Sequence, residues 1–170
     1  MAQAGSEAEV RRAEAADLPA ITAIYNRYVA ETPITFDIEP FTVEQRRAWF
    51  AQFGAAGRCQ LFVAVVGGAL AGYAGSTKHK EKRAYDTSVE TTIYLDPAHV
   101  GRGLGGALYR RLFEALADED VHAALAGITL PNEASLGLHR RFGFVEIGVF
   151  HEVGRKFGRY WDVLWLEKRF

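Results

Sequence analysis

Residues 100–107 read Val-Gly-Arg-Gly-Leu-Gly-Gly-Ala, between an expected strand at Thr92–Leu95 and an expected helix that begins near Leu104. A glycine-rich turn at the start of a helix exposes backbone N–H groups at the positive end of the helix dipole, and such turns bind phosphate groups. The glycines at positions 101, 103 and 106 also spell the dinucleotide fingerprint G-x-G-x-x-G. The phosphate that this loop binds therefore decides the class of enzyme.

The surroundings of the loop argue against a dinucleotide. That fingerprint follows the first strand of a βαβ unit, and an acidic residue about 20 positions later binds the ribose. Here several expected strands precede the loop, and the next strand, Leu125–Leu130, offers no acidic residue. No Lys-Ser or Lys-Thr pair follows the glycines, which excludes a P-loop. The residues alone leave open another anion-binding loop or a close turn without a ligand.

The composition predicts one domain over residues 1–170 and excludes several classes of partner. The 20 Lys and Arg residues nearly balance 21 Asp and Glu residues, so we expect neither nucleic acid nor a membrane surface as partner. A single cysteine, Cys59, excludes an internal disulfide and is consistent with a cytoplasmic location. The histidines show no metal-ligand spacing, so no metal is expected. Met1–Val10 lacks the basic and apolar regions of a signal peptide.

The uncharged segment Cys59–Thr77 has the length of a membrane span, but Gly67-Gly68 divides it. We therefore expect two buried strands, Cys59–Val66 and Ala69–Ser76, joined by a tight turn. Along the whole chain the patterns predict the order β-α-α-β-β-β-α-β-α-β-β. This order indicates an α/β (α+β) fold with a mixed sheet and helices on its faces. Four helices are expected to begin at Asp17, Thr42, Leu104 and Asn132. The helix from Thr42 ends near Gly54, and the helix from Asn132 ends at Gly143. The remaining expected strands are Val10–Ala13, Thr87–Leu95, Ala123–Leu130, Phe144–Val153 and Trp161–Leu166.

The segment Val89–Phe144 resembles the GNAT acetyltransferase superfamily. Residues 100–105 correspond to its Q/R-x-x-G-x-G/A signature, although Val100 stands where the family has Gln or Arg, and Arg102 keeps a cation nearby. The chain is most similar to phosphinothricin acetyltransferases and related amino-acid N-acyltransferases. The resemblance implies the GNAT fold, a mixed, mostly antiparallel twisted sheet flanked by helices. Its further carriers are Asn132, Ser135, Gly143-Phe144, Thr35-Phe36, Ala84-Tyr85-Asp86, Val89-Glu90, Leu138-His139 and Lys156-Phe157-Gly158-Arg159.

The resemblance implies acetyl-CoA as co-substrate, with its pyrophosphate on the glycine loop. The pantetheine arm would lie along Glu90–Leu95 and pair with the main chain of Ile93 and Leu95, as an added strand does. The residues expected to bind the cofactor are Ile93, Tyr94, Leu95, Val100, Gly101, Arg102, Gly103, Leu104, Gly105, Gly106, Asn132 and Ser135.

Acetyl transfer requires a neutral amine, whereas amines are mostly protonated at pH 7. Glu90 lies in an otherwise uncharged strand, where a carboxylate is either solvated, paired or functional. The resemblance at Val89-Glu90 implies the general base. His139 occupies the place where many GNAT proteins have a tyrosine that protonates the leaving thiolate. We expect His139 to be catalytic; the alternative is a histidine that only packs against the cofactor.

An amino-acid substrate carries a carboxylate and needs a cation. The basic loop Lys78–Arg83 offers Lys82 and Arg83, with Tyr85 beside them, and Phe36 resembles the family's pocket wall. We expect acetylation of the α-amino group of a small amino acid such as phosphinothricin, methionine sulfoximine or methionine sulfone, by direct transfer in a ternary complex. The aromatic-rich end, Phe150–Phe170, indicates a homodimer. The alternative functions are a non-catalytic acyl-CoA sensor and a protein or peptide N-terminal acetyltransferase.

Overall fold

The computed structural model describes residues 8–170. They form one seven-stranded sheet in the order β1-β2-β3-β4-β5-β7-β6, and among its neighbours only β4 and β5 are parallel. The mixed, mostly antiparallel sheet expected from the sequence is confirmed. The strands are β1 (Glu9–Arg12), β2 (Leu61–Val66), β3 (Ala69–Lys78), β4 (Ser88–Leu95), β5 (Ala123–Thr129), β6 (Val145–Lys156) and β7 (Arg159–Arg169); the helices are α1 (Leu18–Glu31), α2 (Val43–Phe50), α3 (Leu104–Ala117) and α4 (Glu133–Arg141).

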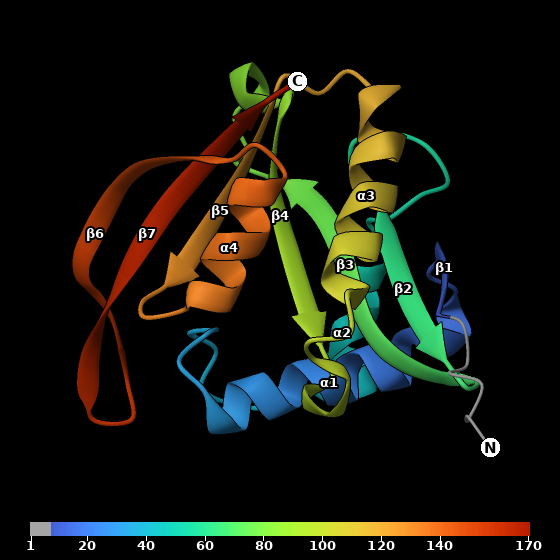
Figure 1. The fold of residues 1–170 in the computed structure, drawn as a ribbon, viewed down its shortest axis with the longest axis horizontal. Coiled ribbons are helices and arrows are strands. Elements are labelled where there is room, and N and C mark those ends of the chain that lie inside the picture. Colours follow the sequence, from blue (N-terminus) through green and yellow to red (C-terminus); the bar gives the residue numbers. More distant parts are fainter. Residues whose placement is uncertain (1–7) are drawn as a thin grey trace.

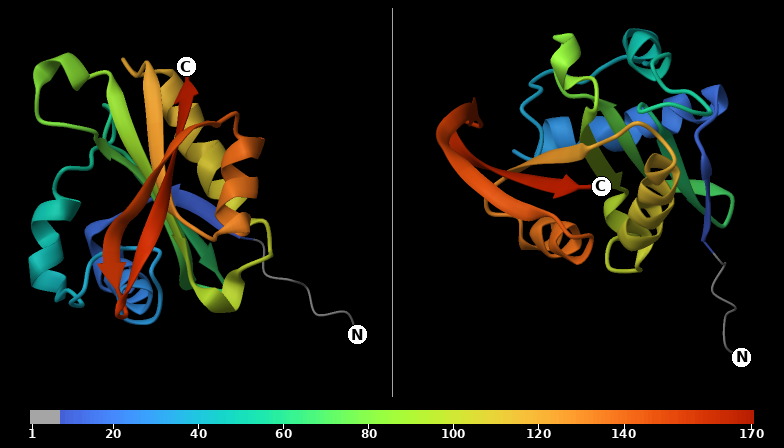
Figure 2. Two further views of the ribbon diagram at one scale, coloured as in Figure 1. Left: turned by 90° about the vertical axis from the view of Figure 1, so that its left-hand side faces the viewer. Right: turned by 90° about the horizontal axis from the view of Figure 1, so that it is seen from above.

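Helices cover both faces of the sheet, α3 and α4 on one and α1 and α2 on the other (Figures 1 and 2). The four-residue spacing of apolar side chains in α3, Leu104 to Leu116, creates one buried stripe, and this stripe packs on the sheet. On the opposite face, Ile21 and Ile24 of α1 pack against Val63 and Tyr73. The central strands are thus fixed from both sides.

Strands β4 and β5 begin side by side and then diverge (Figure 1). Their pairing ends at Glu90 and Leu125, after three residue pairs, whereas β4 stays paired with β3 as far as Leu95. Beyond Glu90, therefore, the edge of β4 that faces β5 has no strand partner. The backbone groups on that edge are open to a ligand lying between the two strands.

Most expected elements are confirmed, and the differences lie at their ends. The second helix ends at Phe50 instead of Gly54, and the first strand of the apolar pair begins at Leu61 instead of Cys59. The last two strands are longer than expected because they continue to a tight turn at Phe157-Gly158. Within residues 8–170, no helix combines the length and apolarity that crossing a membrane requires.

Candidate active site

The glycine loop shapes the start of α3. Gly101 and Gly103 have φ angles of 81° and 79°, a left-handed backbone that other residues adopt at a cost. Gly103 is the N-cap of α3, and no side chain caps this helix. A Cβ at Gly105 would lie 3.2 Å from Leu138 of α4, so the two helices approach closely here. The result is an uncapped, positive helix end next to the β4–β5 gap, suited to an anion.

A cation near this helix end was missed by the sequence reasoning. Arg141 Nη1 would lie 3.9 Å from a Cβ at Gly106, so the guanidinium stands over the first turn of α3. Arg102, the cation that was considered, lies exposed in the loop itself. The sequence feature that could have pointed to Arg141 is the run of basic residues at the end of α4, His139 to Arg141. That Arg141 lies near the glycine loop, however, depends on the packing of α3 against α4.

Three adjoining cavities follow β4 from the glycine loop to Glu90. The first, of about 280 Å³, is the Val100 cavity, and its lining includes Leu95, Val100, Ser135 and Leu138. The second, the central cavity of about 60 Å³, lies in the β4–β5 gap between Thr91–Tyr94 and Ala126–Thr129. The third, the Phe36 cavity of about 460 Å³, is lined by residues that include Phe36, Glu90, Thr92 and Trp165. Ile34 borders all three cavities, so they form a path.

The two faces of β4 differ because side chains alternate along a strand. Val89 and Ile93 pack within the core that contains α3 and α4. Tyr94 instead packs edge-on against Tyr25 and Tyr28 of α1, with ring centroids 5.1 Å apart in both pairs. Glu90 shares the face of Tyr94, since it lies four residues earlier. The carboxylate and α4 therefore lie on opposite faces of the sheet.

Glu90 is both paired and accessible. Its side chain is 36% exposed, and Oε1 lies 2.7 Å from Nδ1 of His79. It borders the Phe36 cavity and also a cavity of about 560 Å³, the His79 cavity, which His79, Lys80 and Trp165 help to line. A carboxylate at the junction of two cavities is well placed to accept a proton from a bound amine.

His139 is buried, at 2% exposure, and lies at the wall of the central cavity. Its Nδ1 lies 2.8 Å from the carbonyl oxygen of Ser135, and its Nε2 lies 2.8 Å from the hydroxyl of Tyr109. Burial lowers the pKa of His139, against the smaller effect of the Ser135 carbonyl. The ring is therefore neutral near pH 7: its Nδ1–H donates a hydrogen bond to the Ser135 carbonyl, and its Nε2 accepts a hydrogen bond from the Tyr109 hydroxyl.

This arrangement corrects the expected chemistry of His139. Both nitrogens of this neutral imidazole are hydrogen-bonded to protein groups, so the ring has no N–H directed at a ligand. Tyr109, which also borders the central cavity, is the polar group that the sequence reasoning missed. Burial raises its pKa, so the hydroxyl keeps its proton. The sequence feature that could have pointed to Tyr109 is the presence of a tyrosine on the apolar face of α3.

Six of the twelve residues expected to bind the cofactor line the path, namely Ile93, Tyr94, Leu95, Val100, Asn132 and Ser135. Asn132 caps α4 by accepting the Ser135 N–H at 3.2 Å, and both residues border the Val100 cavity and the central cavity. Ile93 borders the same two cavities, and Tyr94 borders the central one. The carbonyl of Leu95 already accepts the Tyr28 hydroxyl at 2.7 Å, which leaves one lone pair for a further donor.

Phe36 lies in the segment 32–42, which joins α1 to α2 and crosses beneath β6. A Cβ at Gly154 would fall 2.1 Å from the Phe36 ring, so only glycine permits this contact. The buried Lys156 donates Nζ–H to the Thr35 carbonyl at 2.8 Å, and burial lowers the pKa of this lysine. The hairpin of β6 and β7 thus holds Phe36 in the wall of its cavity.

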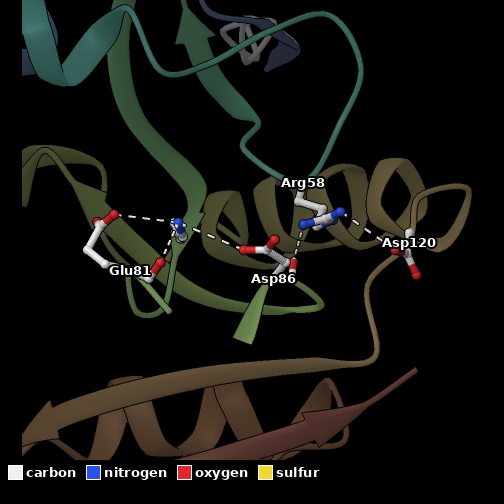
Figure 3. A network of polar contacts seen from close by, with 5 residues as sticks. Arg58, Glu81, Asp86 and Asp120 are labelled. Atoms are coloured by element: carbon white, nitrogen blue, oxygen red, sulfur yellow. Dashed lines mark hydrogen bonds and ion pairs between the residues drawn. The ribbon is translucent and has the colours of Figure 1, made fainter. Parts of the chain in front are cut away.

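The basic loop is arranged differently from the expectation. Lys78 is engaged by Glu81 and Asp86, at 3.5 Å and 3.8 Å, in a network that continues to Arg58 and Asp120 (Figure 3). Lys82 and Arg83 are exposed, and neither borders the cavities around Glu90. Lys80 does border the His79 cavity, and its Nζ lies 5.2 Å from the centre of the Tyr85 ring. Of these basic residues, Lys80 is the one that shares a cavity lining with Glu90.

Comparison with known proteins agrees with this geometry. The model of the acetyltransferase (GNAT) family matches residues 21–144. The chain belongs to this family. It is 53% identical, over 96% of both chains, to a phosphinothricin N-acetyltransferase of Streptomyces coelicolor. An L-methionine sulfoximine/L-methionine sulfone acetyltransferase of Pseudomonas aeruginosa is 35% identical, with 94% of this chain and 93% of that protein covered.

A solved structure extends the comparison to the fold. It is a GNAT superfamily phosphinothricin acetyltransferase of Sinorhizobium meliloti in complex with acetyl-CoA. It is 31% identical, with a TM-score of 0.89 and coverage of 95% of this chain and 88% of that one. The present chain is accordingly a GNAT N-acetyltransferase. Among residues 8–170, no cluster of three or more His, Cys, Asp or Glu side chains offers a metal site.

Proposed function

We propose that this GNAT enzyme transfers the acetyl group of acetyl-CoA to the α-amino group of a small amino acid, directly and within a ternary complex. The observation that carries the proposal is the continuous path along β4, with an uncapped helix end at one end and Glu90 at the other. Phosphinothricin, methionine sulfoximine and methionine sulfone are the first substrates to test, since the names of two similar proteins contain them.

The cofactor half of the proposal uses the glycine loop and the gap. The pyrophosphate would bind at residues 100–106, where backbone N–H groups of α3 point outward and Arg141 stands nearby. The pantetheine arm would occupy the Val100 cavity and pair with open backbone groups of Ile93 and Leu95. The thioester would then reach the central cavity, between β4 and β5.

The chemistry takes place at the end of this path. Glu90 removes a proton from the substrate ammonium, and the neutral nitrogen attacks the thioester carbonyl. A backbone N–H near Thr92 or Ile93 holds the oxyanion. The nitrogen of the tetrahedral intermediate then gives its second proton to solvent, the C–S bond breaks, and coenzyme A leaves as the thiolate. We assign His139 a positioning role: it orients the hydroxyl of Tyr109 at the wall of the central cavity.

The substrate half is formed by the Phe36 cavity and the His79 cavity. Phe36 supplies an apolar wall for the amino-acid side chain. The sequence predicts Lys82 and Arg83 as the cations for the substrate carboxylate, with Tyr85 beside them. Lys80 is the stronger candidate for this ion pair, since it borders the cavity that also contains Glu90.

The test is release of free thiol from acetyl-CoA with a panel of amines. The panel contains the three named amino acids, the common amino acids, their N-acetylated forms as blanks and short peptides with free N-termini. We expect turnover with one or more amino acids and a loss of about 100-fold or more in Glu90→Gln. Tight binding of acetyl-CoA without any turnover would instead identify a sensor. Turnover with peptides alone would identify an N-terminal acetyltransferase.

We further propose that the enzyme is a cytoplasmic homodimer. Strand β6 lies at the edge of the sheet, and large apolar side chains of the β6–β7 hairpin are more than half exposed. An exposed edge with apolar side chains favours contact with another chain. The side chains concerned are Val145, Ile147, Phe150, Val153, Phe157 and Tyr160. Sedimentation equilibrium should give a dimer for the wild type and a monomer for Ile147→Glu; a wild-type monomer would contradict this proposal.

A further inference from the structure

We propose that His79 is the positioning residue of the general base: it binds one oxygen of the Glu90 carboxylate and leaves the other directed at the substrate amine. The inference rests on the proposed role of Glu90 and adds a second residue to it. His79 carried no role in the sequence analysis, because it lies in a loop and shares no motif with Glu90.

The sheet register brings the two side chains together. Thr77 of β3 pairs directly with Glu90 of β4, so the two residues share a face of the sheet. His79 lies two residues beyond Thr77 and is the diagonal neighbour of Glu90 on that face. The chain remains close to β4 at this point, since the N–H of His79 donates to the carbonyl of Ser88 at 3.4 Å. The contact therefore follows from strand pairing.

The imidazole ring is confined by its neighbours. The side chain of His79 is 13% exposed. Its ring lies edge-on to Tyr85, with centroids 5.7 Å apart, and edge-on to Trp165 at 6.4 Å. On the N-terminal side of His79, the chain is tied down by Lys78, which contacts Asp86 in the network that also includes Arg58 (Figure 3). A ring held in this way gives its partner a fixed orientation.

The chemistry of the pair specifies the donor. An ionised carboxylate has no proton to give, so the imidazole donates Nδ1–H to Oε1 across 2.7 Å. The hydrogen bonds among residues 8–170 leave Oε2 of Glu90 without a protein donor. In the reaction, Oε2 gains the proton as the N–H bond of the ammonium breaks, and His79 keeps its own proton throughout. Its effect is thus on the orientation of the base.

The decisive variants separate hydrogen bonding from packing. His79→Phe keeps an aromatic ring against Tyr85 and Trp165 but has no N–H. His79→Asn places an amide N–H near the position of Nδ1. We expect His79→Phe to lower kcat about 10- to 100-fold, in line with the cost of misplacing a catalytic group, with KM for both substrates within about twofold. His79→Asn should recover most of kcat. Equal losses in both variants, or a rise in KM without a fall in kcat, would overturn the proposal.

A double variant links the effect to Glu90. In the Glu90→Gln background, His79→Phe should cause no further loss, because the group that it positions is already absent. A further loss of the same size would overturn the proposal, since His79 would then act independently of Glu90. His79→Leu provides the same comparison if His79→Phe does not fold, as judged by its thermal unfolding.

The same set distinguishes the two levels of inference. A Glu90→Gln enzyme with wild-type turnover would refute the general base itself, which belongs to the proposed function. An inactive Glu90→Gln enzyme together with a fully active His79→Phe enzyme would refute only the role of His79.

Discussion

The two faces of β4 were assembled in different ways. The face toward α3 and α4, with the glycine loop at its end, is a closed hydrophobic core whose side chains are largely buried. The face that carries Glu90 collects side chains from the segment 32–42, the loop after β3 and the β6–β7 hairpin. The first face is suited to a constant ligand, acetyl-CoA. The second face has open cavities in which a change in one loop alters the substrate.

If this division is real, substitutions on the two faces should affect different quantities. The largest difference between the effect on kcat and the effect on acetyl-CoA binding is expected for Glu90→Gln, which keeps the size of the side chain and removes the base. We expect kcat to fall by about 100-fold or more, while the Kd for acetyl-CoA, measured by calorimetry, stays within about twofold. A matching loss of acetyl-CoA affinity would show that the two faces do not act separately.

A substitution in the glycine loop should have the opposite effect: it should weaken acetyl-CoA binding and leave the KM for the amino acid unchanged. Gly103→Ala places a Cβ on a residue with φ of 79°, which costs about 1–2 kcal/mol. If that strain is relieved in the free loop, the Kd for acetyl-CoA rises by about 5- to 30-fold. The KM for the amino acid should not change. Gly137→Ala, at an exposed position of α4, is the control, because Gly137 has no positive φ and no atom would lie within 4 Å of its Cβ. Equal weakening in both variants would contradict the strain argument.

The substrate face alone should respond at Gly154. A methyl group there would fall 2.1 Å from the Phe36 ring and displace it from the cavity wall. We expect the KM for the amino acid to rise about 5- to 10-fold in Gly154→Ala, since overpacking costs about 1 kcal/mol or more. The Kd for acetyl-CoA should be unaffected. Gly137→Ala in α4 has no atom within 4 Å of its Cβ and serves as control. An unchanged KM in Gly154→Ala would remove Phe36 from the proposed site.

The smallest expected effect is on the pH dependence of folding stability, and it comes from His139 on the face of β4 toward α3 and α4. The folded-state pKa of His139 is lowered from its ordinary value of 6.5 by burial. Below pH 6.5 the unfolded chain therefore binds this proton more readily than the folded chain, and stability decreases as the pH falls. His139→Gln should remove that part of the decrease, measured as urea midpoints between about pH 7.5 and about pH 5.5. The exposed His122→Gln should keep the wild-type slope; an unchanged slope in His139→Gln would contradict the burial argument.

Local patterns predicted much of the fold and the cofactor half of the candidate site. The stripe of leucines in α3, the cap at Asn132 and the Gly67-Gly68 turn each act within a few residues of the chain. The shape of the glycine loop also depends only on nearby residues. The positive φ angles at positions 101 and 103 explain why both residues are glycine. The neutral state of His139 was not predictable in this way, because it depends on burial in the tertiary core, where the ring also meets Tyr109, 30 residues away.

The sequence by itself determined the elements, their order, the glycine loop and the presence of a carboxylate in the central strand. These follow from spacing, capping and backbone conformation, which are short-range properties of the chain. The tertiary structure decided what surrounds the carboxylate: His79 at 2.7 Å, Lys80 instead of Lys82 or Arg83 at the cavity, and Phe36 against Gly154. Those contacts depend on strand register and on the close packing of distant segments, and neither is encoded by any one stretch of residues.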